Sequence, residues 1–212
     1  MSAYDRTVAL IAEARANGDD TGWLERLYAE AGQDPGRVPW ANRIGNQNVR
    51  DWLDRPRVHT GRALVVGCGL GYDAEELALR GYQVTAFDVA PSAVAWAERI
   101  HPETAVTYEA ADLLQPPGKW ANAFDLVLEV NTLQVLRGEA RRTALRALQG
   151  FLAPGGSLLV LARGREPDED EGTFPWPLTR AELVADGLET VTFEDFTDAD
   201  GARRFRVEWR RP

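Results

Sequence analysis

The chain is poor in the residues that most often bind metals or form disulfides. It has one cysteine, Cys68, and two histidines among 212 residues. A single cysteine can form neither an intramolecular disulfide nor a cysteine-ligated zinc site within one chain. No apolar run approaches the roughly 18 residues of a membrane-spanning helix, and the start lacks the pattern of a cleavable signal peptide. We therefore expect a cytoplasmic protein with no metal site and no membrane partner.

The sequence is also short of positive charge. Its 24 Lys and Arg residues are outnumbered by 33 Asp and Glu residues, which gives a net charge of -9 at pH 7. Nucleic acids bind basic surfaces because their phosphates are negative, so we do not expect nucleic acid as the main partner. The length and the 44% content of hydrophobic residues suffice for one well-buried domain with an appended N-terminal segment.

Three alternating glycines stand between an apolar run and a helical pattern. Residues 62–88 read RALVVGCGLGYDAEELALRGYQVTAFD, in which a second apolar run ends at Asp88. Strand, glycine turn, helix, strand and terminal acid is the layout of a βαβ unit that binds an adenosine-containing cofactor. The glycines let the backbone approach the ligand closely, and the acid can accept from both ribose hydroxyls.

The spacing of the glycines distinguishes two kinds of cofactor. A dinucleotide turn, G-x-G-x-x-G, would place its third glycine at Tyr72. Here Gly67, Gly69 and Gly71 form the pattern G-x-G-x-G instead. This pattern resembles motif I of the class I S-adenosylmethionine-dependent methyltransferases, whose cofactor has no phosphates to bind.

Further helices and strands alternate along the rest of the chain. Residues 91–100 and 139–151 show helical spacing, and strands are expected at 105–110, 123–130, 157–162, 189–196 and 202–210. The last two strands form a hairpin, so one strand should lie antiparallel in an otherwise parallel sheet. In the final strand, one face is expected to be wet, formed by Arg204, Arg206, Glu208 and Arg210. A solvated helix face is expected for Arg141, Arg142 and Arg146.

The N-terminal residues carry three short amphipathic helical patterns, at 2–16, 23–28 and 49–53. They precede the first strand of the core. We expect an N-terminal helical cap at 1–56 and a cofactor-binding core at 57–212. The cap would act either as a lid over the cofactor or as an interaction arm.

From about Arg57 to its C-terminus, the chain resembles the class I methyltransferases. The motifs are VVGCGLG, AADLL, FDLVLEV and APGGSLLVLA, followed by the closing hairpin. The N-terminal segments Gly22-Trp23 and Val38-Pro39-Trp40 look like the thiopurine S-methyltransferase-like branch, which includes halide and thiol methyltransferases. The chain departs from that branch at Gly45-Asn46-Gln47, where a Pro-rich stretch is common, and at Glu129-Val130, where the thiopurine enzymes have Asp-Arg. The resemblance implies a Rossmann-like α/β fold with a seven-stranded, mostly parallel sheet.

The resemblance also implies a binding site for S-adenosylmethionine. Carried over by position, its residues are Trp23, Trp40, Gly67, Cys68, Gly69, Gly71, Asp88, Val89, Asp112, Leu113, Glu129 and Val130. Asp88 would bind the ribose, and Asp112 the adenine amino group. Structural roles remain open: Asp88 could cap the next helix, Asp112 could be an ordinary turn acid, and Cys68 could be core filler. The two tryptophans could likewise be core anchors.

The acceptor is expected beyond the carboxyl ends of the strands. Its candidate residues are Trp40, Asn131, Phe174 and Trp176. Glu129 would orient the acceptor or take its proton, or else hold the methionine ammonium. We expect both His59 and His101 to lie at the opposite end of the sheet, so the acceptor should be a thiol, a phenol or a heteroaromatic nitrogen, which needs little help from a base.

Two other functions fit parts of the pattern. One is a protein that binds S-adenosylmethionine without methylating anything. The other is an NAD-dependent oxidoreductase, against which Tyr72 in place of glycine and the terminal hairpin both argue.

Overall fold

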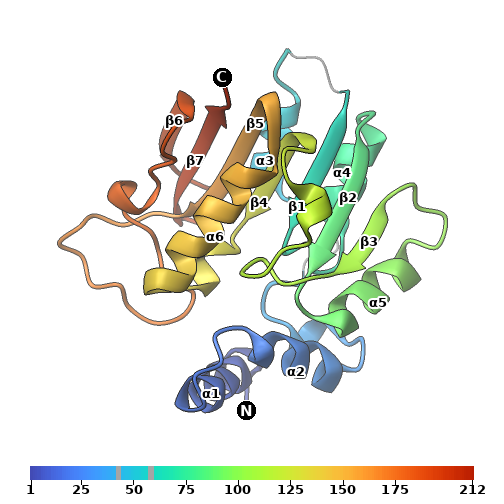
Figure 1. Ribbon diagram of the computed structural model, residues 1–212. Helices are drawn as coiled ribbons and strands as arrows, with labels where there is room; N and C mark the ends of the chain where they lie inside the picture. The colour runs from blue at the N-terminus through green and yellow to red at the C-terminus, as the bar shows by residue number, and fades with distance from the viewer. Residues whose placement is uncertain (42–43, 57–59) are drawn as a thin grey trace.

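The computed structural model describes residues 1–41, 44–56 and 60–212. In this part of the chain a seven-stranded sheet has the order β3-β2-β1-β4-β5-β7-β6 (Figure 1). Its strands are β1 Arg62–Val66, β2 Gln83–Asp88, β3 Thr107–Ala110, β4 Phe124–Val130, β5 Leu152–Arg163, β6 Glu189–Thr197 and β7 Arg203–Arg210. The first five strands pair in parallel, and β7 is antiparallel to both β5 and β6. The predicted mixed sheet with a C-terminal hairpin is therefore confirmed.

Helices cover both faces of this sheet (Figure 1). On one face lie α3 Gln47–Leu53, α4 Tyr72–Leu79 and α5 Pro91–Ile100, and on the other lies α6 Gly138–Phe151. After the exposed Arg62, strand β1 is apolar from Ala63 to Val66. Its Ala63 and Val65 pack on the first face, and its Leu64 and Val66 pack on the second. A central parallel strand is buried on both sides, which explains the unbroken apolar run from Ala63 to Val66.

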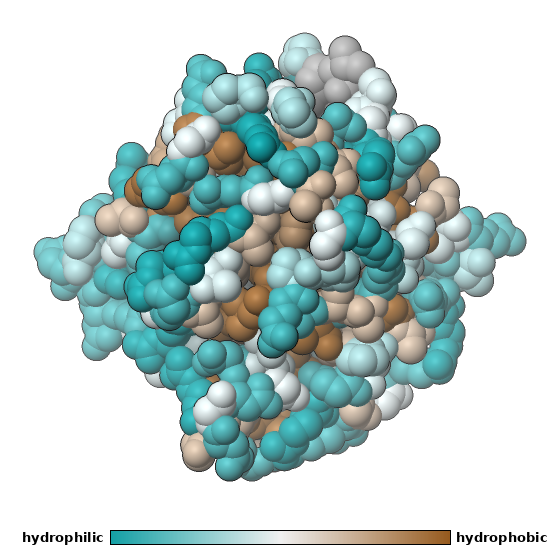
Figure 2. All heavy atoms as spheres, in the orientation of Figure 1, coloured by the Kyte–Doolittle hydropathy of each residue, from teal (hydrophilic) through white to brown (hydrophobic). Residues whose placement is uncertain are grey.

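The N-terminal helices α1 Ala3–Ala16 and α2 Gly22–Ala31 lie together at one end of the sheet (Figure 1). Their apolar residues, such as Leu10 and Leu27, form a third core with Leu70 of the glycine turn and Trp96 of α5. Their outer surface is mostly hydrophilic (Figure 2). The helical cap thus packs beside the glycine turn, while the division between 56 and 57 stays a prediction because residues 57–59 are not described.

Short 3-10 helices connect the main elements, at Pro35–Arg37, Gly118–Trp120, Leu133–Val135 and Arg180–Glu182. Within the described ranges, no helix is long and apolar enough to cross a membrane.

The final strand differs from the expectation of a wet face. Arg206 and Glu208 are buried. Trp52 of α3 donates its Nε1–H to Glu208 Oε2 at 2.9 Å, and Arg206 Nη1 donates to the carbonyl of Asn48 at 2.7 Å. The expectation was wrong because α3, which lies more than 150 residues earlier in the sequence, covers this face.

Arg141 also differs from the expectation, whereas its neighbours Arg142 and Arg146 are exposed as expected. The Arg141 side chain is 4% exposed. It points inward because the 3-10 helix Leu133–Val135 and the loop at Trp176 both present carbonyl oxygens to it. A periodic pattern places Arg141 on a helix face but does not show which loop covers that face.

Candidate cofactor and acceptor site

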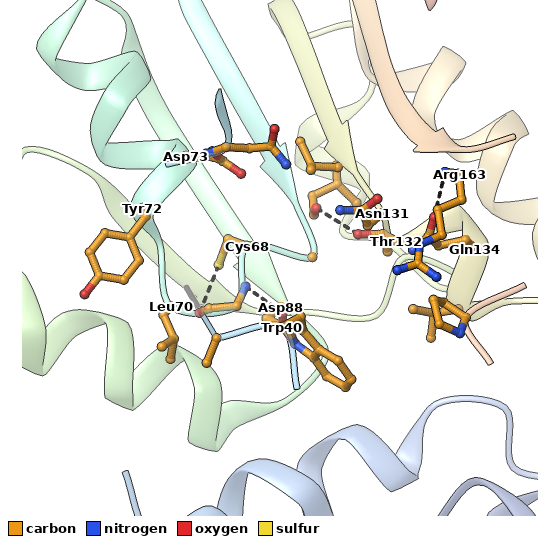
Figure 3. A pocket seen from close by; sticks show the side chains of 18 of the residues that line it. Trp40, Cys68, Leu70, Tyr72, Asp73, Asp88, Asn131, Thr132, Gln134 and Arg163 are labelled. Atoms are coloured by element: carbon orange, nitrogen blue, oxygen red, sulfur yellow. Dashed lines mark hydrogen bonds between the residues drawn. The ribbon is translucent and has the colours of Figure 1, made fainter. Parts of the chain in front are cut away.

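A cavity of about 1210 Å³ lies at the carboxyl ends of the parallel strands. Its walls come from the loops that follow β1, β2, β3 and β4, from the N-terminal residues near Tyr28 and Trp40, and from the loop at Phe174 (Figure 3). Open α/β sheets bind their ligands at this end, where the strand order reverses. Here the order reverses between β1 and β4.

The glycine turn forms one wall of the cavity. Gly67, Gly69 and Gly71 all have positive φ angles, of 61°, 52° and 83°. A Cβ atom on Gly67 would lie 2.3 Å from Thr132 Oγ1, and one on Gly71 would lie 2.2 Å from the Tyr108 hydroxyl oxygen. Side chains are therefore excluded at both positions by contact as well as by conformation. The turn lines the cavity with its backbone, which fits a ligand held by main-chain contacts, as S-adenosylmethionine would be.

Asp88 connects this turn to the next helix. Its Oδ2 accepts the N–H of Gly69 at 2.9 Å and its Oδ1 accepts the N–H of Ala90 at 3.0 Å. Ala90 is the N-cap residue of α5, and α5 has no side-chain cap, so Asp88 bonds the residue before the helix without capping the helix itself. Asp88 nevertheless lines the cavity. Each carboxylate oxygen has a second lone pair, which leaves acceptors for ligand hydroxyls. Burial raises the pKa of this carboxyl, while its backbone hydrogen bonds lower it.

Three further predicted cofactor residues line the same cavity, namely Val89, Leu113 and Val130. Asp112 lines it too, and its Oδ1 accepts the N–H of Leu114 at 2.8 Å, so it is also a turn acid. Cys68 lies within the glycine turn. Burial raises the pKa of its thiol well above the usual value, which keeps the thiol protonated and unreactive.

Two aromatic side chains from the N-terminal segment close the cavity above the glycine turn. Trp40 donates its Nε1–H to the Tyr28 hydroxyl at 2.9 Å. The Tyr28 hydroxyl lies beside Gly69. A Cβ atom added to Gly69 would be 3.1 Å from the hydroxyl oxygen. Tyr28 was missed among the sequence candidates, although it belongs to the amphipathic pattern at 23–28. Its role depends on the contact with Trp40, which no local pattern reveals.

Trp23 and Trp176 do not line the cavity in the structure. Trp23 is buried behind it, with ring centroids 6.0 Å from Trp40 and 5.3 Å from Phe174. Trp176 packs against Phe174 at 5.4 Å, and the guanidinium of Arg15 lies 4.4 Å from its ring centroid. These two tryptophans therefore support the cavity wall from behind, and this placement favours the core-anchor role for Trp23. Trp40 and Phe174 form the wall itself.

Glu129 is likewise absent from the cavity wall. Its side chain is fully buried, and its Oε1 accepts the N–H groups of Thr132 and Leu133. Its Oε2 has no hydrogen-bond partner among the described residues, and burial raises its pKa to about 7. Glu129 holds the loop after β4 in shape, where Asn131 has a positive φ of 63°. The placement does not support contact with an acceptor or with the methionine ammonium.

His59 lies outside the described residues. The prediction that His101 lies at the far end of the sheet was wrong. Its Nε2 is 3.1 Å from the carbonyl oxygen of Leu70, in the glycine turn, and its ring packs on Tyr72. The reason is that α5 lies beside α2 near the cofactor end (Figure 1). His101 nevertheless stays behind the turn, and no histidine lines the cavity within the described ranges.

Several polar residues of the wall were not among the sequence candidates. Asp73, in the first turn of α4, accepts the N–H of Asn46 at 2.6 Å, and burial raises its pKa to about 6. Gln134 and Arg163 lie on the opposite side (Figure 3). Arg204 also lines the cavity. Arg163 ends β5, so its position at a strand's carboxyl end was a usable signal. Asp73 and Arg204 needed the tertiary structure.

Comparison with known proteins identifies the domain. Residues 63–156 match the family model described as "Methyltransferase domain". The chain is 24% identical over 210 residues to "Probable thiol methyltransferase 2" of Arabidopsis thaliana, a match that covers 96% of the chain and 88% of the relative. Residues 63–156 thus match a methyltransferase domain, and the matches together support a class I S-adenosylmethionine-dependent methyltransferase.

Two further comparisons are also with methyltransferases. The chain is 33% identical over 138 residues to "Ubiquinone biosynthesis O-methyltransferase" of Marinobacter nauticus, a match over 63% of the chain and only 55% of that relative. Its fold is similar to that of the N-methyltransferase NodS from Bradyrhizobium japonicum bound to S-adenosylhomocysteine, with a TM-score of 0.68, 22% identity, and coverage of 91% and 98% of the two chains. Solved structures of similar fold include proteins bound to S-adenosylmethionine and to S-adenosylhomocysteine.

We expect Asp88→Ala to weaken binding of S-adenosylhomocysteine by about 1.5–3 kcal/mol, because it removes hydrogen bonds to a charged group. Isothermal titration calorimetry measures the change. Asp168→Ala, an exposed acid outside the cavity, is the control. Asp88 also accepts the N–H of Gly69, so its loss can destabilise the protein. Thermal unfolding of the unliganded variant is therefore measured first, and calorimetry is done at a temperature at which the variant is folded. Unchanged affinity in folded Asp88→Ala would remove Asp88 from the cofactor site.

Proposed function

We propose that this methyltransferase transfers the methyl group of S-adenosylmethionine to a small-molecule acceptor, with thiols, phenols and heteroaromatic nitrogens favoured. The observation that supports this most is the state of the acids on the cavity wall. Asp73, Asp88 and Asp112 each accept a backbone N–H, and Asp198 is paired with Arg204 at 2.6 Å. The two other acids of the described wall, Asp51 and Asp200, are exposed to solvent. With no histidine on the described wall, the acceptor must supply much of its own acidity.

The contribution of the protein is then alignment and exclusion of water. The cofactor supplies a methyl group already activated by its sulfonium. Trp40 and Phe174, whose rings lie 6.0 Å apart, enclose the space in front of the glycine turn. An acceptor held in this enclosed space reacts without the entropy cost of a bimolecular encounter and away from competing water.

The N-terminal segment is proposed as a lid over the cofactor. Three observations support this. Tyr28 and Trp40 are hydrogen-bonded to each other, both line the cavity, and the Tyr28 hydroxyl lies beside Gly69. The segment is part of the enclosure and is more than an arm for interaction with another protein.

The acceptor class has support from the relatives. The match over nearly the whole chain is to a protein named as a thiol methyltransferase, and the more similar but shorter match is to a protein named as an O-methyltransferase. Thiols and acidic hydroxyl groups both ionise readily, which agrees with a described wall that has no histidine to act as a base.

A panel of thiols, phenols, heteroaromatic nitrogens, amines and aliphatic alcohols tests the proposal, with tritiated cofactor and rates measured against pH. We expect the rate to follow the ionisation of the acceptor, and aliphatic alcohols to be inert. His101→Asn, behind the glycine turn, should leave the pH profile in place. Preference for an unactivated alcohol would contradict the proposed acceptor class. Cofactor binding without turnover on any acceptor would favour a protein that binds S-adenosylmethionine but does not methylate.

A further inference from the structure

One wall of the cavity is rich in hydrogen-bond donors. It is formed by the loop after β4, the end of β5 and the start of β7, and it faces the glycine turn and Asp88 across the cavity (Figure 3). Gln134 is buried in this wall, and its Oε1 accepts the backbone N–H of Arg163 at 2.9 Å. That contact turns the amide so that its NH2 group has no acceptor among the described residues.

Two arginines reach the same wall, and they differ in their partners. Arg204 is neutralised, because its Nε lies 2.6 Å from Asp198 Oδ2 and its Nη1 donates to Asn131 Oδ1 at 3.3 Å. Arg163 is exposed at the cavity mouth, and no carboxylate of the described residues forms an ion pair with it. In a protein of net charge -9, this is a cation left available at a binding cavity.

We propose that the acceptor carries a carboxylate, separate from the atom that receives the methyl group, and that the Arg163 guanidinium binds it. The inference rests on the proposed function and specifies its acceptor. A guanidinium presents parallel N–H donors that match a carboxylate, and the NH2 group of Gln134 adds a donor beside it. The acceptor then spans the cavity, with its carboxylate at the β5 end and its reacting atom near Trp40 and the glycine turn.

The transfer itself is balanced without further reactants. The lone pair of the acceptor sulfur, oxygen or nitrogen forms the new bond to the methyl carbon as the bond from that carbon to the sulfonium breaks. The products are the methylated acceptor and neutral-sulfur S-adenosylhomocysteine, and the acceptor's proton is lost to water. The carboxylate bound by Arg163 takes no part in bond making and serves to orient the molecule.

The test compares 4-mercaptobenzoate with 4-mercaptobenzamide, which has the same shape and an electron-withdrawing group but no charge. We expect wild type to favour the carboxylate in kcat/KM by about tenfold or more, mainly through KM, as a charge-assisted bidentate contact predicts. Arg163→Gln should reduce that ratio about tenfold, with Arg163→Lys in between because Lys keeps the charge but loses the fork. Arg142→Gln removes an exposed charge outside the cavity and should keep the wild-type ratio.

Three outcomes would overturn the inference. The first is a wild-type ratio near one, and the second is a ratio that Arg163→Gln leaves unchanged. The third is loss of affinity for S-adenosylhomocysteine in Arg163→Gln with an unchanged acceptor ratio, which would assign Arg163 to the carboxylate of the cofactor. Failure of the proposed function looks different, because then neither thiol is methylated by any variant.

Discussion

Replacing Arg141 with alanine is expected to lower the free energy of unfolding by about 3 kcal/mol, the range for removing one partner of a buried ion pair. The side chain is 4% exposed and pairs with Glu182. Its Nε donates to the carbonyls of Leu133 at 3.1 Å and Leu136 at 2.9 Å, and its Nη2 donates to the carbonyl of Trp176 at 3.3 Å. The variant removes the arginine donor from all three carbonyls, although that of Leu133 still accepts the N–H of Leu136. Glu182 is partly exposed and can regain water, which keeps the loss at the lower end of the range.

The adjacent residue in the same helix provides a matched control. The Arg142 side chain is 64% exposed and pairs with the equally exposed Glu139, so Arg142→Ala should change stability by less than about 0.5–1 kcal/mol. Urea denaturation of both variants measures the difference. Because Arg141 joins the loop after β4 to the loop at Trp176, the folded Arg141→Ala protein should also show a higher KM for the acceptor. Equal stabilities for the two variants would show that the buried network contributes nothing.

The elements predicted well are those whose signal is local. The apolar run of β1, the three glycines and Asp88 lie within 27 consecutive residues, and the packing of each follows from short-range geometry. Positive φ at Gly67, Gly69 and Gly71 requires glycine, so the residue type itself reports the conformation. The position of the cavity follows from the parallel strand order, because such sheets bind ligands at their carboxyl edge.

The interpretations that failed concern side chains whose partners lie far away in the sequence. Arg141, Arg206 and Glu208 look solvent-facing by periodicity, yet partners 41 and 156 residues away bury two of them, Glu182 for Arg141 and Trp52 for Glu208. Glu129 looked like a cavity acid because it lies near the carboxyl end of β4, one residue before Val130. Alternation along the strand instead turns it toward the α6 side, where the backbone of Thr132 and Leu133 caps it.

The stability difference between wild type and Glu129→Gln is expected to depend steeply on pH. Burial raises the pKa of Glu129 from an ordinary value of 4.5 to about 7 in the folded protein. The folded state therefore holds a proton that the unfolded state releases between these two pH values. This contribution to stability is fully present below about pH 4.5, is lost as the pH rises to about 7, and is constant above that. The loss amounts to about 3 kcal/mol over the interval.

The glutamine variant does not titrate, and its carbonyl oxygen can still accept the N–H groups of Thr132 and Leu133. The free energy of unfolding of Glu129→Gln, relative to that of wild type, should therefore increase by about 3 kcal/mol between pH 4.5 and pH 7.5. Urea unfolding of both proteins across this range measures the gain, and the titrations of Asp73 and Asp88 cancel in the difference because both proteins share them. Parallel stability curves for the two proteins would mean that Glu129 ionises normally in the folded state. In that case water or another donor must reach Glu129 Oε2, which means that the loop after β4 does not exclude solvent from this carboxyl.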